Sequence, residues 1–219
     1  MHTQGLYYEN GDTLWVNLYT PSTVQWQTTG LSLALETDFP MGEAVTLHVT
    51  QGAPQELTLA LRRPGWTGEG FKIKINGEAV SLPPAHWMKQ EQRGPGWYRD
   101  PQRILGDPVS DYVTLKRVWQ AGDSIEILLP KSLRLESTPD DPNRAAVLWG
   151  PLVLAGDVTD LTSPYPVLEV AGQPVVEWLK PISGQPGEFR TRVADVTFRP
   201  FYRTHRRTYG IYWPLTTPH

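Results

Sequence analysis

The chain has 219 residues, with 20 Lys and Arg against 23 Asp and Glu, a net charge of −3 and 39% hydrophobic residues. This length allows one large or two small domains, the interspersed charge offers no basic stripe for nucleic acid, and no apolar run is long enough to span a membrane. There is no cysteine, which excludes disulfides, thiolate metal sites and a cysteine nucleophile in this polypeptide. We expect no signal peptide in this chain, which leaves cytoplasmic, periplasmic and secreted locations open.

Apolar residues recur at every second position in several short segments of the first half of the chain. Such alternation gives a strand one buried and one exposed face, as an antiparallel sheet requires. Turn-forming Gly, Pro and Asp residues separate the segments. We therefore predict strands at residues 14–19, 31–36, 45–50 and 57–61.

Two hairpins are predicted after these strands. Residues 71–75 alternate apolar side chains with two lysines and end at Asn76-Gly77, a pair that type I′ turns prefer because both positions need positive φ. In the second hairpin, residues 112–119 are expected to pair with residues 124–129.

Residues 83–110 break this rhythm with several Pro and Gly residues and predict a long loop, of a kind that is usually either functional or flexible. Strands resume after the turn-rich residues 139–143, and no helical stripe longer than about two turns is present. These later strands are predicted at residues 145–149, 152–155, 196–202 and 209–213, the first and second being buried on both faces.

The pattern predicts an all-β protein. Its fold is expected to consist of two consecutive antiparallel β-sandwich-like units, residues 1–133 and residues 134–219. The stretch that leads from residue 133 into the turn-rich residues 139–143 marks the division between the two units.

Seven segments, in this order along the chain, resemble the C-terminal β-sandwich region of glycoside hydrolase family 127, the β-L-arabinofuranosidase family. The segments are LWVNLYTPS (14–22), LSLALETDFP (31–40), LALRRPGW (59–66), IKINGE (73–78), VWQAGD (118–123), DDPNRAAVLWGPLVLA (140–155) and PFYRTHRRTYGIYW (200–213). Each segment is weakly specific alone, while the ordered set covers most of the chain.

The resemblance implies a parent enzyme in which an (α/α)6 barrel carries catalysis through a zinc-bound cysteine, with β-sandwich domains after it. It places this chain after the last catalytic cysteines, so no catalytic residue transfers to any position here. The implied parent acts on L-arabinofuranosides or related plant glycans, and its zinc is expected outside this chain, which should contain no cofactor of its own. The chain alone is expected to be inactive and to support the missing barrel. A second copy of the chain and plant-type oligosaccharides are the other partners considered, whereas nucleic acid and membranes are not expected.

Aromatic residues in Gly- and Pro-rich loops are the candidate contact residues, because indole faces stack on the apolar faces of sugar rings. They are Trp66, Trp87, Trp97 and Tyr98, and packing against a neighbouring domain is favoured over sugar contact for them. The tryptophans within strands are assigned to the core instead; these are Trp15, Trp119, Trp149 and Trp213.

Metal-binding and catalytic sites are not expected in this chain. The five histidines are widely spaced, which disfavours a metal site; they are His2, His48, His86, His205 and His219. Two alternatives to an accessory domain remain: a stand-alone carbohydrate-binding module that uses the loop aromatics, and a hydrolase with a pair of strand carboxylates.

Overall fold

The structure is a computed structural model that describes residues 5–85, 87–88, 107–108, 110–138, 140–141, 143–159, 166–170, 172–192 and 194–216. The chain forms two compact units, which are described separately below. Unit 1 comprises residues 1–87 and 108–130, and unit 2 comprises residues 88–107 and 131–219. Strands dominate both units, which confirms the all-β prediction.

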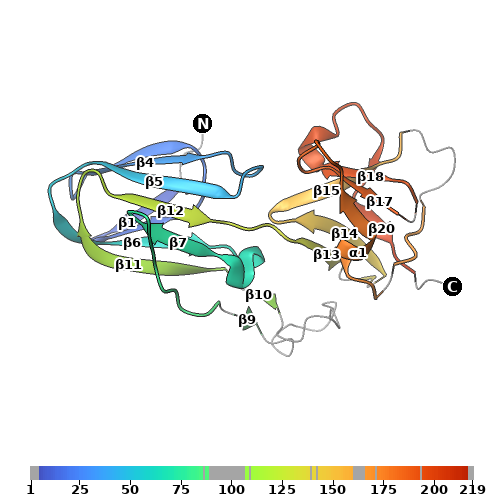
Figure 1. Cartoon of the computed structure of the whole chain (residues 1–219), viewed down its shortest axis with the longest axis horizontal. Helices are drawn as coiled ribbons and strands as arrows, with labels where there is room; N and C mark the ends of the chain where they lie inside the picture. Colours follow the sequence, from blue (N-terminus) through green and yellow to red (C-terminus); the bar gives the residue numbers. More distant parts are fainter. Residues whose placement is uncertain are drawn as a thin grey trace. The chain divides into compact units, whose positions relative to one another are not determined.

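Unit 1 is a sandwich of two sheets (Figure 1). One sheet has the order β1-β2-β6-β11 and the other the order β3-β4-β5-β12-β7-β8, and all pairs are antiparallel except β2 with β6. The strands are β1 (Tyr7–Asn10), β2 (Thr13–Val16), β3 (Ser22–Trp26), β4 (Leu31–Thr37), β5 (Ala44–Gln51), β6 (Gln55–Arg63), β7 (Lys72–Ile75), β8 (Glu78–Ala79), β11 (Asp111–Trp119) and β12 (Ser124–Leu128), with a 3-10 helix η1 (Gly65–Gly70) after β6.

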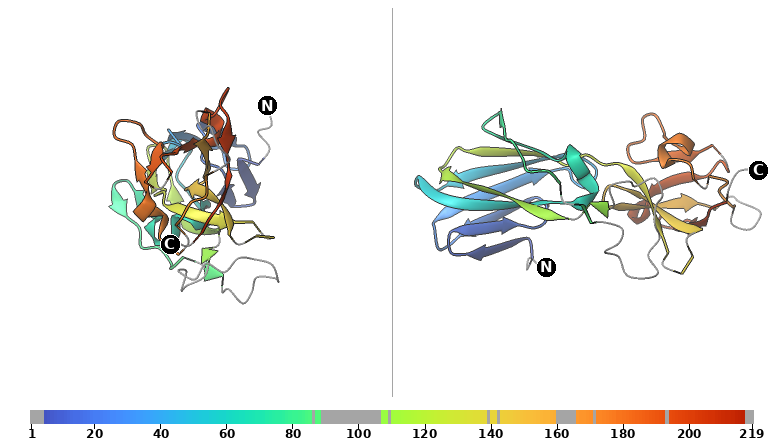
Figure 2. Two further views of the ribbon diagram at one scale, coloured as in Figure 1. Left: turned by 90° about the vertical axis from the view of Figure 1, so that its right-hand side faces the viewer. Right: turned by 90° about the horizontal axis from the view of Figure 1, so that it is seen from below.

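One apolar core fills the space between these two sheets. The period-two pattern explains it, because every second residue of a strand points to the same side. Leu57, Leu59 and Leu61 of β6 face the core from one sheet, and Leu33 and Leu47 face it from the other. The strands of both layers run in similar directions (Figure 2), as expected for an aligned sandwich.

The two predicted hairpins have different outcomes. Strands β7 and β8 pair across Asn76-Gly77, whose φ angles are 52° and 85°, so the first hairpin is confirmed. The second is wrong: β11 pairs with β6 in one sheet, whereas β12 pairs with β5 and β7 in the other. The turn between β11 and β12 crosses from one layer of the sandwich to the other, which lets both strands direct apolar side chains into the shared core.

A buried tyrosine ties the segment after β2 to β6. Tyr19 is 4% exposed, and its hydroxyl donates a hydrogen bond of 2.5 Å to the Arg62 carbonyl oxygen. Burial raises the pKa of Tyr19 far above its ordinary value of 10.0. The hydroxyl therefore stays neutral in the folded chain at pH values where the unfolded chain ionises it.

Replacing Tyr19 by phenylalanine should reveal this difference as a pH dependence. Below pH 10 the Tyr19 hydroxyl keeps its proton in both the folded and the unfolded chain. Above pH 10 the hydroxyl loses its proton first in the unfolded chain. The free energy of unfolding should then fall by up to about 1.4 kcal/mol per pH unit through Tyr19 alone. Urea unfolding from about pH 8 to 11 should show a shallower decline for Tyr19→Phe, which should be about 1 kcal/mol less stable near neutrality because the carbonyl loses its donor. Parallel curves would contradict this assignment.

Unit 2 is built around an eight-stranded antiparallel sheet with the order β13-β14-β15-β18-β17-β16, in which β19 also pairs with β15 and β20 with β14. Its elements are β13 (Leu133–Ser137), β14 (Arg144–Trp149), β15 (Leu152–Asp157), α1 (Val175–Trp178), β16 (Leu179–Pro181), β17 (Phe189–Thr191), β18 (Thr197–Pro200), the 3-10 helix η3 (Phe201–Arg203), β19 (Tyr209–Gly210) and β20 (Tyr212–Pro214). Trp213 and Phe198 lie in its separate core, with ring centroids 5.0 Å apart.

The strand tryptophans divide into two groups. Trp119 and Trp213 are fully buried, as predicted, whereas Trp15 and Trp149 are only partly buried. Trp15 pairs with Tyr8 across β1 and β2 on the face of the sheet that points away from the core. In the part of the chain that the structure describes, no helix has the length and apolar character needed to cross a membrane.

Candidate functional site

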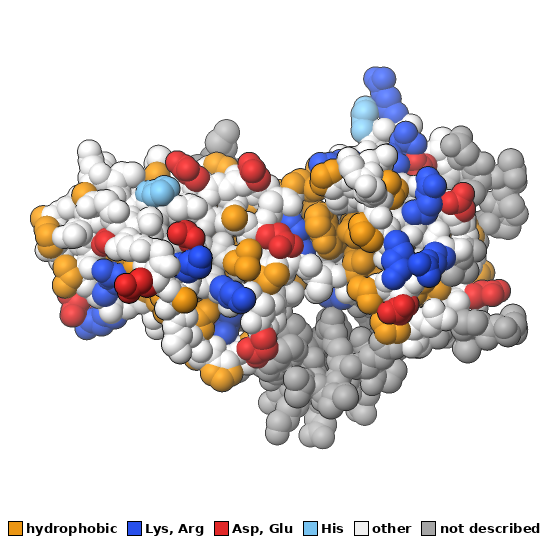
Figure 3. Space-filling model, in the orientation of Figure 1, with side chains coloured by type: hydrophobic (Ala, Val, Ile, Leu, Met, Phe, Trp, Pro, Cys, Tyr) orange, Lys and Arg blue, Asp and Glu red, His pale blue; other side chains and the backbone are white. Residues whose placement is uncertain are grey.

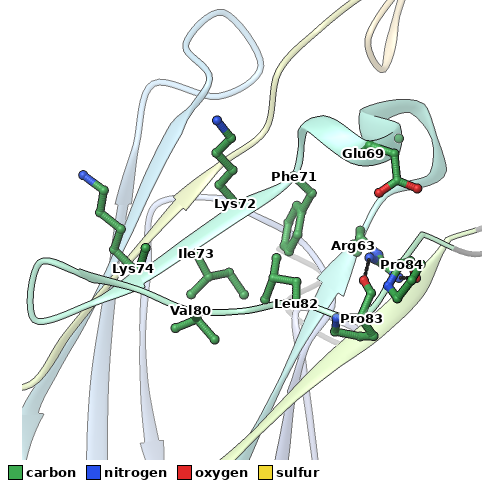
Figure 4. A pocket seen from close by; sticks show the side chains of 12 residues that line it. Arg63, Glu69, Phe71, Lys72, Ile73, Lys74, Val80, Leu82, Pro83 and Pro84 are labelled. Atoms are coloured by element: carbon green, nitrogen blue, oxygen red, sulfur yellow. Dashed lines mark hydrogen bonds between the residues drawn. The ribbon is translucent and has the colours of Figure 1, made fainter.

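A cavity of about 560 Å³ lies in unit 1 between β7 and the chain that returns after β8 (Figure 4). Its apolar wall is formed by Phe71, Ile73, Val80 and Leu82. Arg63 and Glu69 stand at one end of this wall, whereas Lys72 and Lys74 line the edge through β7 and their side chains point away from it (Figure 4). The cavity thus combines an apolar surface with charged groups at its edge.

The local sequence explains why the cavity forms there. Phe71, directly before β7, and Ile73 within it face the core and are 4% and 2% exposed. After the Asn76-Gly77 turn, the Val80 amide donates to the Ile73 carbonyl at 2.9 Å, so the returning chain stays beside β7. Val80 and Leu82 pack against the core only partly, and the hollow lies where they leave β7 incompletely covered.

Arg63 closes one end of this cavity and is itself 4% exposed. Its guanidinium binds the Asp111 carboxylate through two hydrogen bonds, from Nε at 2.8 Å and from an Nη at 2.5 Å. It also donates to the carbonyl oxygens of Pro83 and Pro84, at 2.8 and 2.9 Å (Figure 4). Because these bonds occupy most of its donors, Arg63 acts as a clamp and has little capacity left to bind a ligand.

Electrostatics reinforce the clamp. The hydrogen bond to Asp111 raises the pKa of Arg63, so the guanidinium stays charged at any pH at which the protein folds. Two further bonds hold the same region: the Gly65 amide donates to the Ser110 hydroxyl at 3.0 Å and the Ala85 amide to a Glu69 carboxylate oxygen at 3.2 Å.

The chemistry available in the cavity is limited. Among the described residues that line it, Glu69 is the only carboxylate, whereas glycoside hydrolysis ordinarily uses two. No three His, Cys, Asp or Glu side chains of the described residues lie close enough together to hold a metal ion.

The four predicted contact aromatics do not form a described cluster. Trp66 lies in η1, is partly buried and stacks on Phe39 with 6.2 Å between ring centroids and 14° between ring planes. The backbone of Trp87 lies in β9 (Trp87–Met88), which pairs with β10 (Asp107–Pro108), but its side chain lies outside the described part. Trp97 and Tyr98 fall wholly outside the described residues.

Trp66→Ala should mainly lower stability. Removing the indole takes away its stacking on Phe39 and its packing against the core, and we expect unfolding to become easier by about 2 kcal/mol. Trp66→Phe should recover part of this loss, since a ring remains over Phe39. Thermal unfolding measures the loss. An arabino-oligosaccharide titration that weakened while stability stayed unchanged would instead identify Trp66 as a sugar contact.

Arg63 is the residue of this site that sequence reasoning missed. It continues the core-facing positions Leu57, Leu59 and Leu61 of β6, so a charged residue stands where the pattern calls for an apolar one. This conflict was a usable signal for a buried ion pair, although Asp111, 48 residues away in sequence, could not have been identified as the partner.

Solved structures define the class of fold. A GH127 β-L-arabinofuranosidase from Geobacillus stearothermophilus T6 matches with a TM-score of 0.66 and 22% identity over 97% of this chain and 35% of its own. A structure described as a glycoside hydrolase matches with a TM-score of 0.63 and 18% identity over 96% and 37%. The GH127 β-arabinofuranosidase BT3674 matches with a TM-score of 0.62 and 20% identity over 96% and 36%. The fold is thus that of the β-sandwich part of these larger proteins, and the chain spans little more than a third of their length.

The family follows from a match at the level of sequence. Residues 13–131 match the model of the β-L-arabinofuranosidase GH127 middle domain, which covers more than half of the chain. The chain belongs to glycoside hydrolase family 127, as the sequence resemblance indicated. The matched domain supports a non-catalytic portion of a glycoside hydrolase. No curated protein matched the chain.

Proposed function

We propose that this chain is the accessory β-sandwich part of a family 127 enzyme and that it supports a catalytic barrel. The proposal is supported by the difference in how much of each protein the alignment covers: 97% of this chain aligns with only 35% of a β-L-arabinofuranosidase. The substrates of the parent would be L-arabinofuranosides or related plant glycans. The loop aromatics would contact the barrel, with a second copy of the chain as another candidate partner.

The chemistry of the described residues supports an accessory role. The cavity of unit 1 has one lining carboxylate, Glu69, among described residues, and its arginine is committed to Asp111 and two carbonyl groups. The described residues do not fit a zinc site, and the chain has no cysteine. Zinc chemistry would accordingly belong to the barrel of the parent.

An activity assay tests the accessory role. The purified chain should not hydrolyse an aryl β-L-arabinofuranoside, with or without added zinc, under conditions in which the Geobacillus stearothermophilus enzyme does. Turnover that survives further purification and disappears when a strand carboxylate is replaced would overturn the proposal and favour a hydrolase site on the sandwich.

The coding DNA tests the predicted partner. The frame upstream of the Met1 codon should continue into a barrel-length segment that ends near a cysteine pair. An in-frame stop codon followed by a separate ribosome-binding site would contradict a covalent barrel and favour an independent module.

A further inference from the structure

Unit 2 carries an exposed group of aromatic and basic side chains at residues 201–209, here called the aromatic-basic arm. Phe201, Tyr202 and Tyr209 are 45%, 55% and 39% exposed. The rings of Phe201 and Tyr209 meet edge to face, with centroids 5.3 Å apart at 72°. This geometry fixes both rings while leaving much of their surface open to solvent.

The base of the arm is held by polar contacts. Thr204 is 4% exposed, and its hydroxyl donates to the Phe201 carbonyl at 2.6 Å. The Arg207 guanidinium binds the Asp157 carboxylate at 2.5 Å. Burial acts to raise the pKa of Asp157, but the hydrogen bonds from Thr159 and Arg207 outweigh it, so the pKa is lowered and the carboxylate stays charged near neutrality. The arm is therefore ordered before any ligand arrives.

The arm carries positive charge on a chain whose net charge is −3. Residues 201–209 contain three arginines and a histidine but no Asp or Glu. Arg203 lies over the Tyr202 ring at 5.7 Å, and Arg207 is paired with Asp157. His205 and Arg206 are exposed and form no ion pair with any residue in the described ranges. Figure 3 shows a histidine and Lys or Arg side chains gathered at one edge of this unit.

We propose that the aromatic-basic arm binds an acidic oligosaccharide, a glycan segment that bears uronate groups. Aromatic faces complement the apolar CH surfaces of sugar rings, and a guanidinium complements a carboxylate through paired hydrogen bonds. Tyr209 and Phe201 would contact the ring surface, and Arg206 with His205 would meet the carboxylate. The proposal uses the family membership only to explain why glycans would be near, and it does not depend on a barrel being present.

Other occupants fit the arm less well. Proteins that bind nucleic acid ordinarily carry a longer basic stripe than this arm provides, and the chain as a whole is acidic. A stable protein partner ordinarily buries about 800 Å² and contacts 20–30 residues on each side, far more than the nine residues of this arm. An acidic glycan needs only a few stacked rings and one or two charge contacts.

Calorimetric titration of the full chain with tetragalacturonate, and with its methyl ester as a neutral ligand of the same shape, tests the proposal. The acid form should bind at least about tenfold more tightly than the ester. His205→Gln combined with Arg206→Gln should weaken binding of the acid about tenfold, and Tyr209→Ala should weaken both ligands. Lys116→Gln combined with Arg117→Gln removes two exposed charges from β11 in unit 1 and should leave binding unchanged.

Several results would overturn the proposal. Binding that is absent at millimolar tetragalacturonate, or equal for acid and ester, removes the uronate site. Equal weakening by the control variant in β11 indicates unspecific charge attraction. Displacement of tetragalacturonate by an oligoglutamate peptide at the same concentration would show that the arm binds an acidic protein instead. A sedimentation coefficient that falls with Tyr209→Ala would show that the arm binds a second copy of the chain. None of these results bears on the hydrolysis assay, so the two proposals can fail separately.

Discussion

Arg63→Met should destabilise unit 1 by about 3 kcal/mol. The substitution removes the charge that pairs with Asp111, whose side chain is only 24% exposed, and leaves that carboxylate without its guanidinium. It also takes away the donors bound by the Pro83 and Pro84 carbonyl oxygens. Urea unfolding measures the loss, and hydrogen exchange should show it in β6 and β11.

Two variants separate the clamp from a general effect of removing charge. Arg62→Met changes the adjacent residue, whose side chain points to the opposite face of β6, and should alter stability by no more than about 0.5 kcal/mol. Arg63→Lys keeps the charge but cannot reach the carboxylate and both carbonyl groups at once, so it should recover only part of the loss. Equal destabilisation by the Arg62 and Arg63 variants would show that the clamp is not the cause.

Gly156→Ala should destabilise unit 2 by about 2–3 kcal/mol through overpacking. Gly156 is a buried residue of β15, and a methyl group there would overlap the indole of Trp213 and lie 2.9 Å from Cγ1 of Val196. Trp213 is fully buried against Phe198, so it has little room to move away. Thermal unfolding should show the effect, with protection lost in β15 and β20.

A double-mutant cycle with Trp213→Phe tests this steric cause. The smaller ring leaves space for the added methyl group, so the double variant should be more stable than the sum of the two single effects predicts, by about 1 kcal/mol. Strictly additive losses would indicate that the alanine acts through the backbone of β15 and not through the indole.

The contrast between the two predicted hairpins shows how far local sequence determines strand pairing. The turn at Asn76-Gly77 requires positive φ at two successive residues, and this local requirement was enough to predict that β7 pairs with β8. The turn after Trp119 has no local requirement of this kind that determines which strands pair. Its Gly122 amide donates to the Val49 carbonyl and its Asp123 carbonyl accepts from the Val49 amide, both at 2.9 Å. Contacts with β5, which is distant in sequence, therefore determine that this turn crosses between the sheets. Neither Gly122 nor the alternation of apolar residues in the flanking strands could have predicted the crossing.

The candidate site shows the same limit. Gly- and Pro-rich surroundings drew attention to Trp66, yet the structure places its ring against Phe39 and the core. The central residue, Arg63, could have been noticed as a charge at a core-facing position of β6. Its partners could not, because Asp111 is brought beside it only when β11 pairs with β6.

The Arg63 clamp also determines how freely the chain can vary between its two ends. One buried guanidinium holds Pro83 and Pro84 before residues 85–110 and Asp111 after them, so the sandwich itself fixes where this segment leaves and returns. With the end points fixed, the free-energy cost of closing a connection rises only with the logarithm of its length, and doubling the length adds about 0.6 kcal/mol. A change in the length of the connection between Ala85 and Ser110 should therefore cost unit 1 little stability, provided that Arg63, Pro83, Pro84 and Asp111 and the hydrogen bonds of Ala85 and Ser110 are kept.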